Sequence, residues 1–169
     1  MVIKMLNLVL NWLKGSSQEY IVLMVSSLPI FELRIGIPLG LYFGMPLFKV
    51  FWLALLGNII PVMPLLCLLE PVSIRLRRFK PWRHFFNWLF ARTKNKSELI
   101  QKYEALGLAI FVAIPLPMTG AWTGAVAASL FKIRFRYAFL AIILGVFIAG
   151  LIVSGLSYLG IISYKALIK

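Results

Sequence analysis

Two charged residues lie within an otherwise apolar segment near the start of the chain. Glu32 and Arg34 are the only charged residues between Tyr20 and Gly44. A charged side chain at the centre of a membrane costs about 2.5–3.5 kcal/mol, and such residues by default serve a function. A carboxylate can bind and release a proton, and a guanidinium can hold an anionic group. The pair predicts proton exchange at Glu32 and anion binding at Arg34. The alternative is a mutually neutralised pair with a structural role.

A second short segment, residues 114–125, combines helix-breaking residues with hydrogen-bonding ones. Its sequence is IPLPMTGAWTGA, and its polar side chains are Thr119, Trp122 and Thr123. Its glycines permit close approach of the backbone, and the helix that follows offers free N–H groups to an anion. The alternative is that the threonine hydroxyls satisfy the interrupted backbone while Trp122 packs. The residues predicted to bind substrate or ion in the two segments are Glu32, Arg34, Gly36, Pro38, Pro115, Pro117, Thr119, Gly120, Trp122 and Thr123.

The composition identifies the solvent in which these segments fold. Of the 169 residues, 62% are hydrophobic and 14% are charged, and the five acidic residues are all Glu. Soluble domains average about 45–50% apolar and about 25% charged residues, and disordered chains are poor in apolar residues. The sequence therefore predicts an integral membrane protein and excludes a soluble domain or a disordered chain.

Few residues of this chain could support enzyme or metal chemistry. It contains one Cys (Cys67) and one His (His84), which exclude an internal disulfide framework and argue against a metal site. No nucleophile elbow, phosphate-binding loop or metal-ligand spacing occurs. No cofactor and no enzymatic activity are predicted. Asn58, midway along an apolar stretch, is interpreted as an interhelical contact rather than a ligand contact.

The apolar stretches of the chain fall into two kinds. Residues 50–69 and 137–158 have the length and composition of spanning helices, the first kinked by its two prolines. Residues 20–44 and 105–131 contain clustered Pro and Gly, which leave half-helices of about 10–12 residues. Such a half-helix, at about 1.5 Å per residue, reaches the middle of a bilayer without crossing it. The pattern predicts two re-entrant hairpins, with tips at 32–38 and 114–125 that meet.

The two halves of the chain also resemble each other. At an offset of 88 residues, Leu28-Pro29 aligns with Leu116-Pro117, Gly36 with Gly124, and Leu56-Gly57 with Leu144-Gly145. The predicted fold class is an all-α integral membrane protein with two inverted repeats, each a re-entrant helical hairpin followed by a transmembrane helix. The predicted single membrane domain, 1–169, comprises an interfacial N-terminal helix (1–18), repeat 1 (20–70), a basic amphipathic cytoplasmic loop (71–103) and repeat 2 (104–160).

Basic residues cluster at two places and set the predicted orientation. Nine lie from Arg75 to Lys102, with Glu98 the only acidic residue among them, and three more follow the second hairpin. Both clusters are predicted to be cytoplasmic, which inverts one repeat relative to the other. The basic and aromatic loop is interpreted as a helix on the anionic inner leaflet rather than as a nucleic-acid site. The residues predicted at the lipid surface are Arg75, Arg77, Arg78, Lys80, Arg83, Arg134 and Arg136.

Two segments carry a family resemblance. ELRIGIPLG at 32–40 and PLPMTGAWTGA at 115–125, separated by one spanning helix and a basic loop, resemble the small multi-drug export protein family over roughly residues 20–160. That family is similar in layout to the DedA/VTT superfamily, whose members carry two opposed re-entrant hairpins and include lipid scramblases and undecaprenyl-phosphate translocases. DedA proteins carry arginines in the second hairpin, whereas the second tip here has no charge. The resemblance implies a multi-pass protein of a prokaryotic inner membrane.

Together, these patterns predict a small proton-coupled transporter of an amphiphilic or anionic substrate, such as a polyprenyl phosphate. The predicted partners are anionic lipids of the inner leaflet, the substrate itself and a second copy of the chain. The copies would pack through the glycine series Gly145, Gly150 and Gly155. No nucleic-acid partner is predicted. The alternative function is a non-transporting scaffold that recruits anionic lipid or a partner protein through the 71–103 loop.

Overall fold

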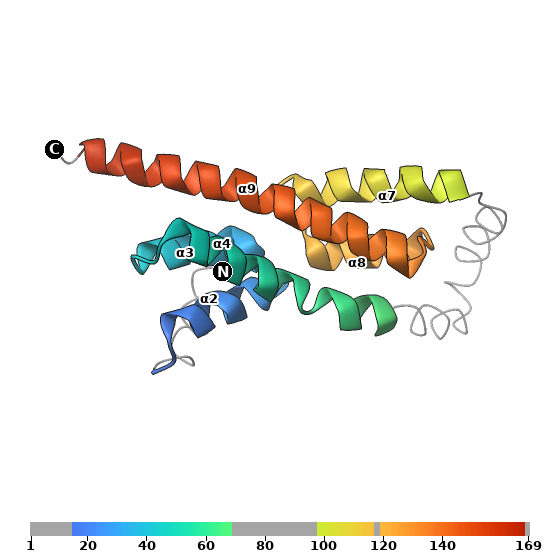
Figure 1. Ribbon diagram of the computed structural model, residues 1–169, viewed down its shortest axis with the longest axis horizontal. Coiled ribbons are helices and arrows are strands. Elements are labelled where there is room, and N and C mark those ends of the chain that lie inside the picture. Colours follow the sequence, from blue (N-terminus) through green and yellow to red (C-terminus); the bar gives the residue numbers. More distant parts are fainter. Residues whose placement is uncertain (1–14, 69–97, 117–118, 168–169) are drawn as a thin grey trace. The chain divides into compact units, whose positions relative to one another are not determined.

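The computed structural model describes residues 15–68, 98–116 and 119–167 (Figure 1). Within these residues the chain is helical and contains no strand, which confirms the predicted all-α class for this part. The helices are α2 (Gln18–Ser27), α3 (Glu32–Tyr42), α4 (Leu47–Ile59), α7 (Glu98–Ala113), α8 (Ala121–Leu130) and α9 (Phe135–Leu167). The predicted N-terminal helix and basic loop lie largely outside the described residues.

Two helical stretches in the described ranges are long and apolar enough to cross a membrane. They are Leu47–Leu68, with 22 residues, and Phe135–Gly160, with 26. They confirm that the stretches predicted at 50–69 and 137–158 contain helices capable of spanning a membrane, and the crossing itself stays a prediction. The first stretch consists of α4, a turn at 60–61 and a further helical segment at 62–68. The turn coincides with Pro61, which has no N–H to continue the helical hydrogen bonding.

The first compact unit, Met1–Ile60 with Val146–Lys169, is built around three mutually packed helices, α2, α3 and α4. Helices α2 and α3 form an antiparallel hairpin, because Gly36 lies against Ser26 and Gly40 lies against Val22. A Cβ atom at Gly36 would collide with Ser26, and one at Gly40 would collide with Val50 of α4. The absence of side chains at these two positions therefore lets α3 approach both α2 and α4 closely.

The later part of α9 belongs to this first unit and packs on α4. The rings of Phe51 and Phe147 meet edge to face, with centroids 5.6 Å apart. Gly150 lies against the same Phe51 ring. In the first turn of α4, Lys49 Nζ donates to Glu19 Oε1 over 2.7 Å. This bond lowers the pKa of the exposed Glu19 carboxyl.

The second compact unit, Pro61–Gly145, repeats the same kind of close packing. Helix α7 packs on α8, and Gly124 of α8 lies against Val112 of α7. Gly145 of α9 lies against the backbone of Ala109 in α7. In the first unit, Gly57 of α4 likewise lies against the backbone of Leu23 in α2. Each unit therefore contains a helical hairpin with a membrane-capable helix resting on it through a glycine.

The hairpin helices are short relative to a membrane. Helices α2, α3 and α8 have 10, 11 and 10 residues. At about 1.5 Å per residue each covers about half of a 30 Å hydrocarbon core. Helix α7 has 16 residues, so the prediction of a 10–12-residue half-helix is wrong there. The lengths of the other three agree with half-helices, and re-entry into a membrane stays a prediction.

The corner that follows each hairpin has the same backbone structure at the predicted offset. After α3, the N–H groups of Phe43, Gly44 and Met45 donate to the carbonyls of Leu39, Leu41 and Gly40 over 3.0, 3.0 and 3.2 Å. The residues 88 positions later make the same three bonds: Phe131, Lys132 and Ile133 donate to Ala127, Ser129 and Ala128 over 2.9, 3.2 and 3.0 Å. Helices α4 and α9 then begin at equivalent residues. The local repeat is thus present in the backbone, and its inversion stays a prediction.

Lys132 occupies a corner position that favours glycine. Its φ is 52°, and the equivalent Gly44 has φ 78°. The left-handed conformation costs an L-residue about 1–2 kcal/mol, a cost that glycine does not have. Glycine, however, loses more backbone entropy on folding, which offsets part of this advantage. We therefore expect Lys132→Gly to raise the free energy of unfolding by about 0.5–1 kcal/mol, measured by denaturant titration in detergent. The reciprocal Gly44→Lys should lower it, since no atom lies within 4 Å of a Cβ at Gly44 and only the backbone is strained. Equal stability of both variants and the parent would contradict this.

Candidate functional site

The turn of the first hairpin lies earlier in the chain than predicted. Helix α2 ends at Ser27 and α3 begins at Glu32, so residues 28–31 form the tip. The prediction of a tip at 32–38 is wrong, because Gly36 and Pro38 lie inside α3. Gly36 serves close packing instead of a turn. Pro38 removes only the hydrogen bond to the Arg34 carbonyl, which a packed helix tolerates.

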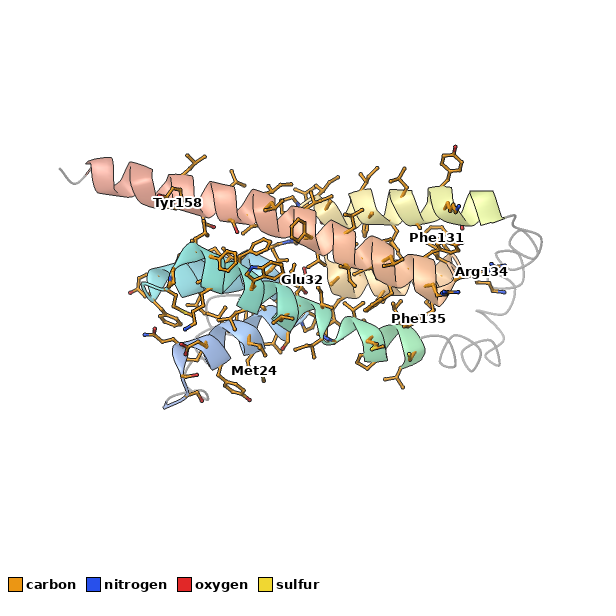
Figure 2. The ribbon with its side chains drawn as sticks, viewed as in Figure 1. Met24, Glu32, Phe131, Arg134, Phe135 and Tyr158 are labelled. Carbon is orange, nitrogen blue, oxygen red and sulfur yellow. The ribbon has the colours of Figure 1, made fainter. Side chains whose placement is uncertain are left out.

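Glu32 lies at the junction between this tip and α3 (Figure 2). The residue is 5% exposed, and its N–H donates to the Leu28 carbonyl over 3.0 Å. Its φ is 49°, a left-handed conformation that costs a non-glycine residue about 1–3 kcal/mol. Such strain persists only where the surroundings enforce it, and it gathers at functional sites. The buried carboxylate of this tip therefore sits on a strained backbone.

Arg34 is the ionic partner of Glu32. Its Nη2 lies 3.8 Å from Glu32 Oε2, and the Arg34 side chain is 20% exposed against 7% for Glu32. This separation exceeds the about 2.7–2.9 Å of a short charge-assisted hydrogen bond. A guanidinium has five N–H donors in a planar arrangement that suits an anionic group. The structure thus places together the two residues that sequence reasoning singled out.

A serine that sequence reasoning missed lies at the centre of the first unit. Ser26 is fully buried, and its hydroxyl donates to the Val22 carbonyl over 2.7 Å. It touches Gly36 of α3 and Gly57 of α4, so α2, α3 and α4 meet at this side chain. The sequence did offer one indication of this contact. Ser26 is a polar residue in an apolar half-helix, and glycines occur in the two helices that follow.

The second tip uses its threonines to satisfy its own backbone. Thr119 Oγ1 lies 2.6 Å from the Ile114 carbonyl and accepts the Leu116 N–H over 3.2 Å. Thr123 Oγ1 accepts the Gly120 N–H over 2.9 Å and lies 3.1 Å from the Gly120 carbonyl. These contacts agree with the alternative interpretation, in which the threonine hydroxyls satisfy the interrupted backbone. Ligand binding by the two hydroxyls stays a prediction.

The remaining predicted residues of the second tip lie close to these threonines in the chain. Gly120 is buried and caps α8, and the half-buried Trp122 belongs to its first turn. Pro115 lies in the turn after α7, while Pro117 lies outside the described residues. The two tips belong to different compact units, so their contact stays a prediction.

Of the residues predicted at the lipid surface, the structure describes Arg134 and Arg136. Both are exposed at the start of α9, where Figure 2 shows Arg134 beside Phe131 and Phe135. These two aromatic rings are also exposed, by 52% and 39%. Basic and aromatic side chains at the end of a spanning helix are typical of a membrane–water interface. The other five, Arg75, Arg77, Arg78, Lys80 and Arg83, lie outside the described residues, as does most of the loop of the scaffold alternative.

Asn58 near the end of α4 is more deeply buried than Glu32. It is 1% exposed, and its Oδ1 accepts no hydrogen bond from the described part of the chain. The interhelical contact predicted for this side chain is therefore not made through its oxygen.

Comparison with known proteins identifies a family. A family model described as "Putative small multi-drug export protein" matches residues 32–152. The matched region starts at Glu32 and includes the second tip and more than half of α9. No curated protein and no solved structure matches the chain.

Proposed function

The chain belongs to the small multi-drug export family, and from this premise we propose that it is a small proton-coupled membrane transporter of an anionic or amphiphilic substrate. The observation that carries the proposal is the tip of the first hairpin. There a buried carboxylate on strained backbone faces a guanidinium between two helices of about half the membrane thickness. Ionisable residues inside a membrane mark substrate paths and proton relays.

The pair supplies a simple coupling mechanism. While Glu32 is ionised, it attracts the Arg34 guanidinium 3.8 Å away. Protonation of the carboxyl removes this attraction and leaves the arginine charge to be balanced by an incoming anion. Loss of the proton restores the competition and favours release of the anion. Proton binding and anion binding therefore stabilise each other, as linkage requires.

The proposed substrate class follows from what surrounds the pair. Thr119 and Thr123 are committed to their own backbone, so recognition of the anionic group is assigned to Arg34. The surface of the spanning helices is rich in exposed apolar side chains, including Leu56, Leu140 and Leu151. A lipid-like anion such as a polyprenyl phosphate fits one charged contact and an otherwise apolar path.

The proposed location is the inner membrane of a prokaryote. The basic start of α9, with Arg134 and Arg136, would then face the cytoplasm beside anionic headgroups, as positive residues favour that side. The basic loop 71–103 would lie on the same side. A second copy of the chain would complete the path.

The test is uptake of farnesyl phosphate, as a short polyprenyl phosphate, into proteoliposomes with an imposed pH gradient. We expect Arg34→Gln to raise the apparent KM by about 10–100-fold, the value of one hydrogen-bonded charge. Arg34→Lys should recover part of the affinity because it keeps the charge.

Lys49→Gln is the matched control, since Lys49 is a basic residue of the same unit that pairs with Glu19 at the surface. It should leave the KM unchanged. An unaltered KM in Arg34→Gln, or an equal rise in both variants, would refute the assigned role.

A further inference from the structure

The corner between α8 and α9, residues 131–136, carries three positive charges at the surface of the second unit. Lys132, Arg134 and Arg136 are all exposed, and the chain contains no acidic residue after Glu104. The proposed coupling at the first tip uses none of these charges. Their role is therefore a separate question.

The equivalent corner of the first repeat shows that the turn can be built without these charges. It makes the same three backbone hydrogen bonds, and it buries Met45 where the second corner buries Ile133. The residues 88 positions before the three basic ones are Gly44, Pro46 and Phe48, which are all uncharged. The basic side chains thus serve something other than the fold of the corner.

The backbone of Lys132 supports the same conclusion. Its φ is 52°, where the equivalent Gly44 has φ 78°, and an L-residue is unfavourable in this left-handed region. Strained residues gather at functional sites and at ligand clamps. What lysine adds here, compared with glycine, is a long side chain with a positive charge. The strain therefore indicates a ligand that uses this charge.

Two exposed aromatic rings accompany the charges. Phe131 and Phe135 are 52% and 39% exposed, and Figure 2 shows both near Arg134. The Phe135 ring stacks on Phe139 with centroids 5.7 Å apart. Apolar rings suit the edge of the acyl-chain region, whereas basic side chains suit anionic headgroups. A surface that combines the two fits the boundary between these layers of a bilayer.

The length of α9 agrees with this placement. The helix has no charged residue between Arg136 and Lys165, and Tyr158 near its other end is 52% exposed (Figure 2). From Phe135 to Tyr158 the helix rises about 34 Å, slightly more than a hydrocarbon core of about 30 Å. Tyrosine is enriched at membrane–water interfaces. When α9 spans a membrane, both Tyr158 and the basic corner therefore lie at headgroup level.

We propose that the 131–136 corner binds anionic phospholipid headgroups through Lys132, Arg134 and Arg136, with the two phenylalanine rings at the edge of the acyl chains. The first N–H groups of α9 add partial positive charge at the same helix end. The three side chains need not meet at one atom, because the ligand is a layer of headgroups. This binding goes beyond the proposed transport and does not depend on it.

The experiment measures thermal unfolding of the full-length protein in detergent micelles that contain dioleoylphosphatidylglycerol or, as the neutral reference, dioleoylphosphatidylcholine. At ten times its apparent Kd, the anionic lipid should raise Tm by about 3–6 °C relative to the neutral lipid. High NaCl should reduce this shift, since salt screens exposed charges. Inorganic phosphate without the lipid should give no shift, because it cannot use the apolar rings.

Lys132→Gly separates lipid binding from folding. Its Tm in the neutral lipid should equal or exceed that of the parent, because the backbone strain is relieved. Its apparent Kd for the anionic lipid should nevertheless rise about fivefold, the value of one basic residue at a membrane surface. The double variant Arg134→Gln/Arg136→Gln should raise the apparent Kd about 25-fold.

Lys49→Gln is the matched control. Lys49 is an exposed basic residue of the first unit that pairs with Glu19, so the variant loses one positive charge away from the corner. It should keep the parental Kd for the anionic lipid. Glu32→Gln should keep it as well, which separates this test from the test of the Glu32–Arg34 mechanism.

Four results would overturn the proposal. They are equal Tm shifts in the two lipids, an equal shift with inorganic phosphate, a parental Kd in the double arginine variant, and a Kd that rises in Lys49→Gln as much as in Lys132→Gly. A more stable Lys132→Gly with weaker lipid binding would support it, since a purely structural lysine would not separate the two measurements.

Discussion

Replacement of Glu32 by glutamine should reduce proton-coupled transport to the background rate while the protein still folds. Glutamine has nearly the shape of glutamate, so the packing of this buried position is kept, but it cannot exchange a proton. It also removes the carboxylate that competes for Arg34, 3.8 Å away. The anion should therefore bind without releasing. The measurement is acidification of pyranine-loaded proteoliposomes after addition of farnesyl phosphate.

A second carboxylate in the chain provides the control for this experiment. Glu104 of α7 is half-buried and belongs to the second compact unit. Glu104→Gln should retain proton flux if coupling resides at the first tip. Coupled flux in Glu32→Gln at the parental rate, with the same amount of folded protein, would rule out the proton-carrying role.

The second large effect is expected at two glycines in equivalent positions, Gly57 and Gly145. A Cβ at Gly57 would collide with the Leu23 carbonyl, and one at Gly145 would lie 2.7 Å from the Ala109 carbonyl. Backbone atoms of a packed helix cannot move aside cheaply. We expect Gly57→Ala and Gly145→Ala each to lower the free energy of unfolding by about 3 kcal/mol, the upper range for overpacking. Denaturant titration of the purified variants would measure it.

Two other glycines should respond with the opposite sign. Nothing lies within 4 Å of a Cβ at Gly107 or Gly155, and both are inside helices. Alanine there restricts the unfolded chain and improves helix propensity, so Gly155→Ala should stabilise the protein by about 0.5–1 kcal/mol. A loss of stability in Gly155→Ala, or none in Gly57→Ala, would show that close helix contacts do not set these values.

The parts of the fold that could be predicted were those encoded by local sequence. The run without charges from Val50 has the composition of a spanning helix wherever it packs. Pro115 with Gly120 interrupts a helix by its own chemistry. Gly36 and Gly40 could not be interpreted locally. Glycine can either end a helix or allow two helices to pack closely. The position of Ser26 and Val22 opposite Gly36 and Gly40 shows that these two glycines serve close packing.

In the candidate site, too, some features could be predicted from local sequence and others depend on tertiary structure. Glu32 and Arg34 stood out because charge is rare in apolar sequence, and the structure places them in contact. The left-handed backbone of Glu32 and the unpaired oxygen of Asn58 depend on tertiary surroundings. Helix α7 starts before the predicted boundary, at Glu98. Glu98 and Lys102 are four residues apart, a spacing that supports a helix. Their charges had suggested that the helix begins only after them.

The left-handed backbone at Glu32 also sets an energy scale for switching. The strain of about 1–3 kcal/mol corresponds to a population bias of roughly 5- to 150-fold, since about 1.4 kcal/mol is tenfold. A proton gradient of one pH unit supplies about the same free energy per proton. Under the proposed coupling, the free energy of a single proton is therefore comparable to the backbone strain held at this residue.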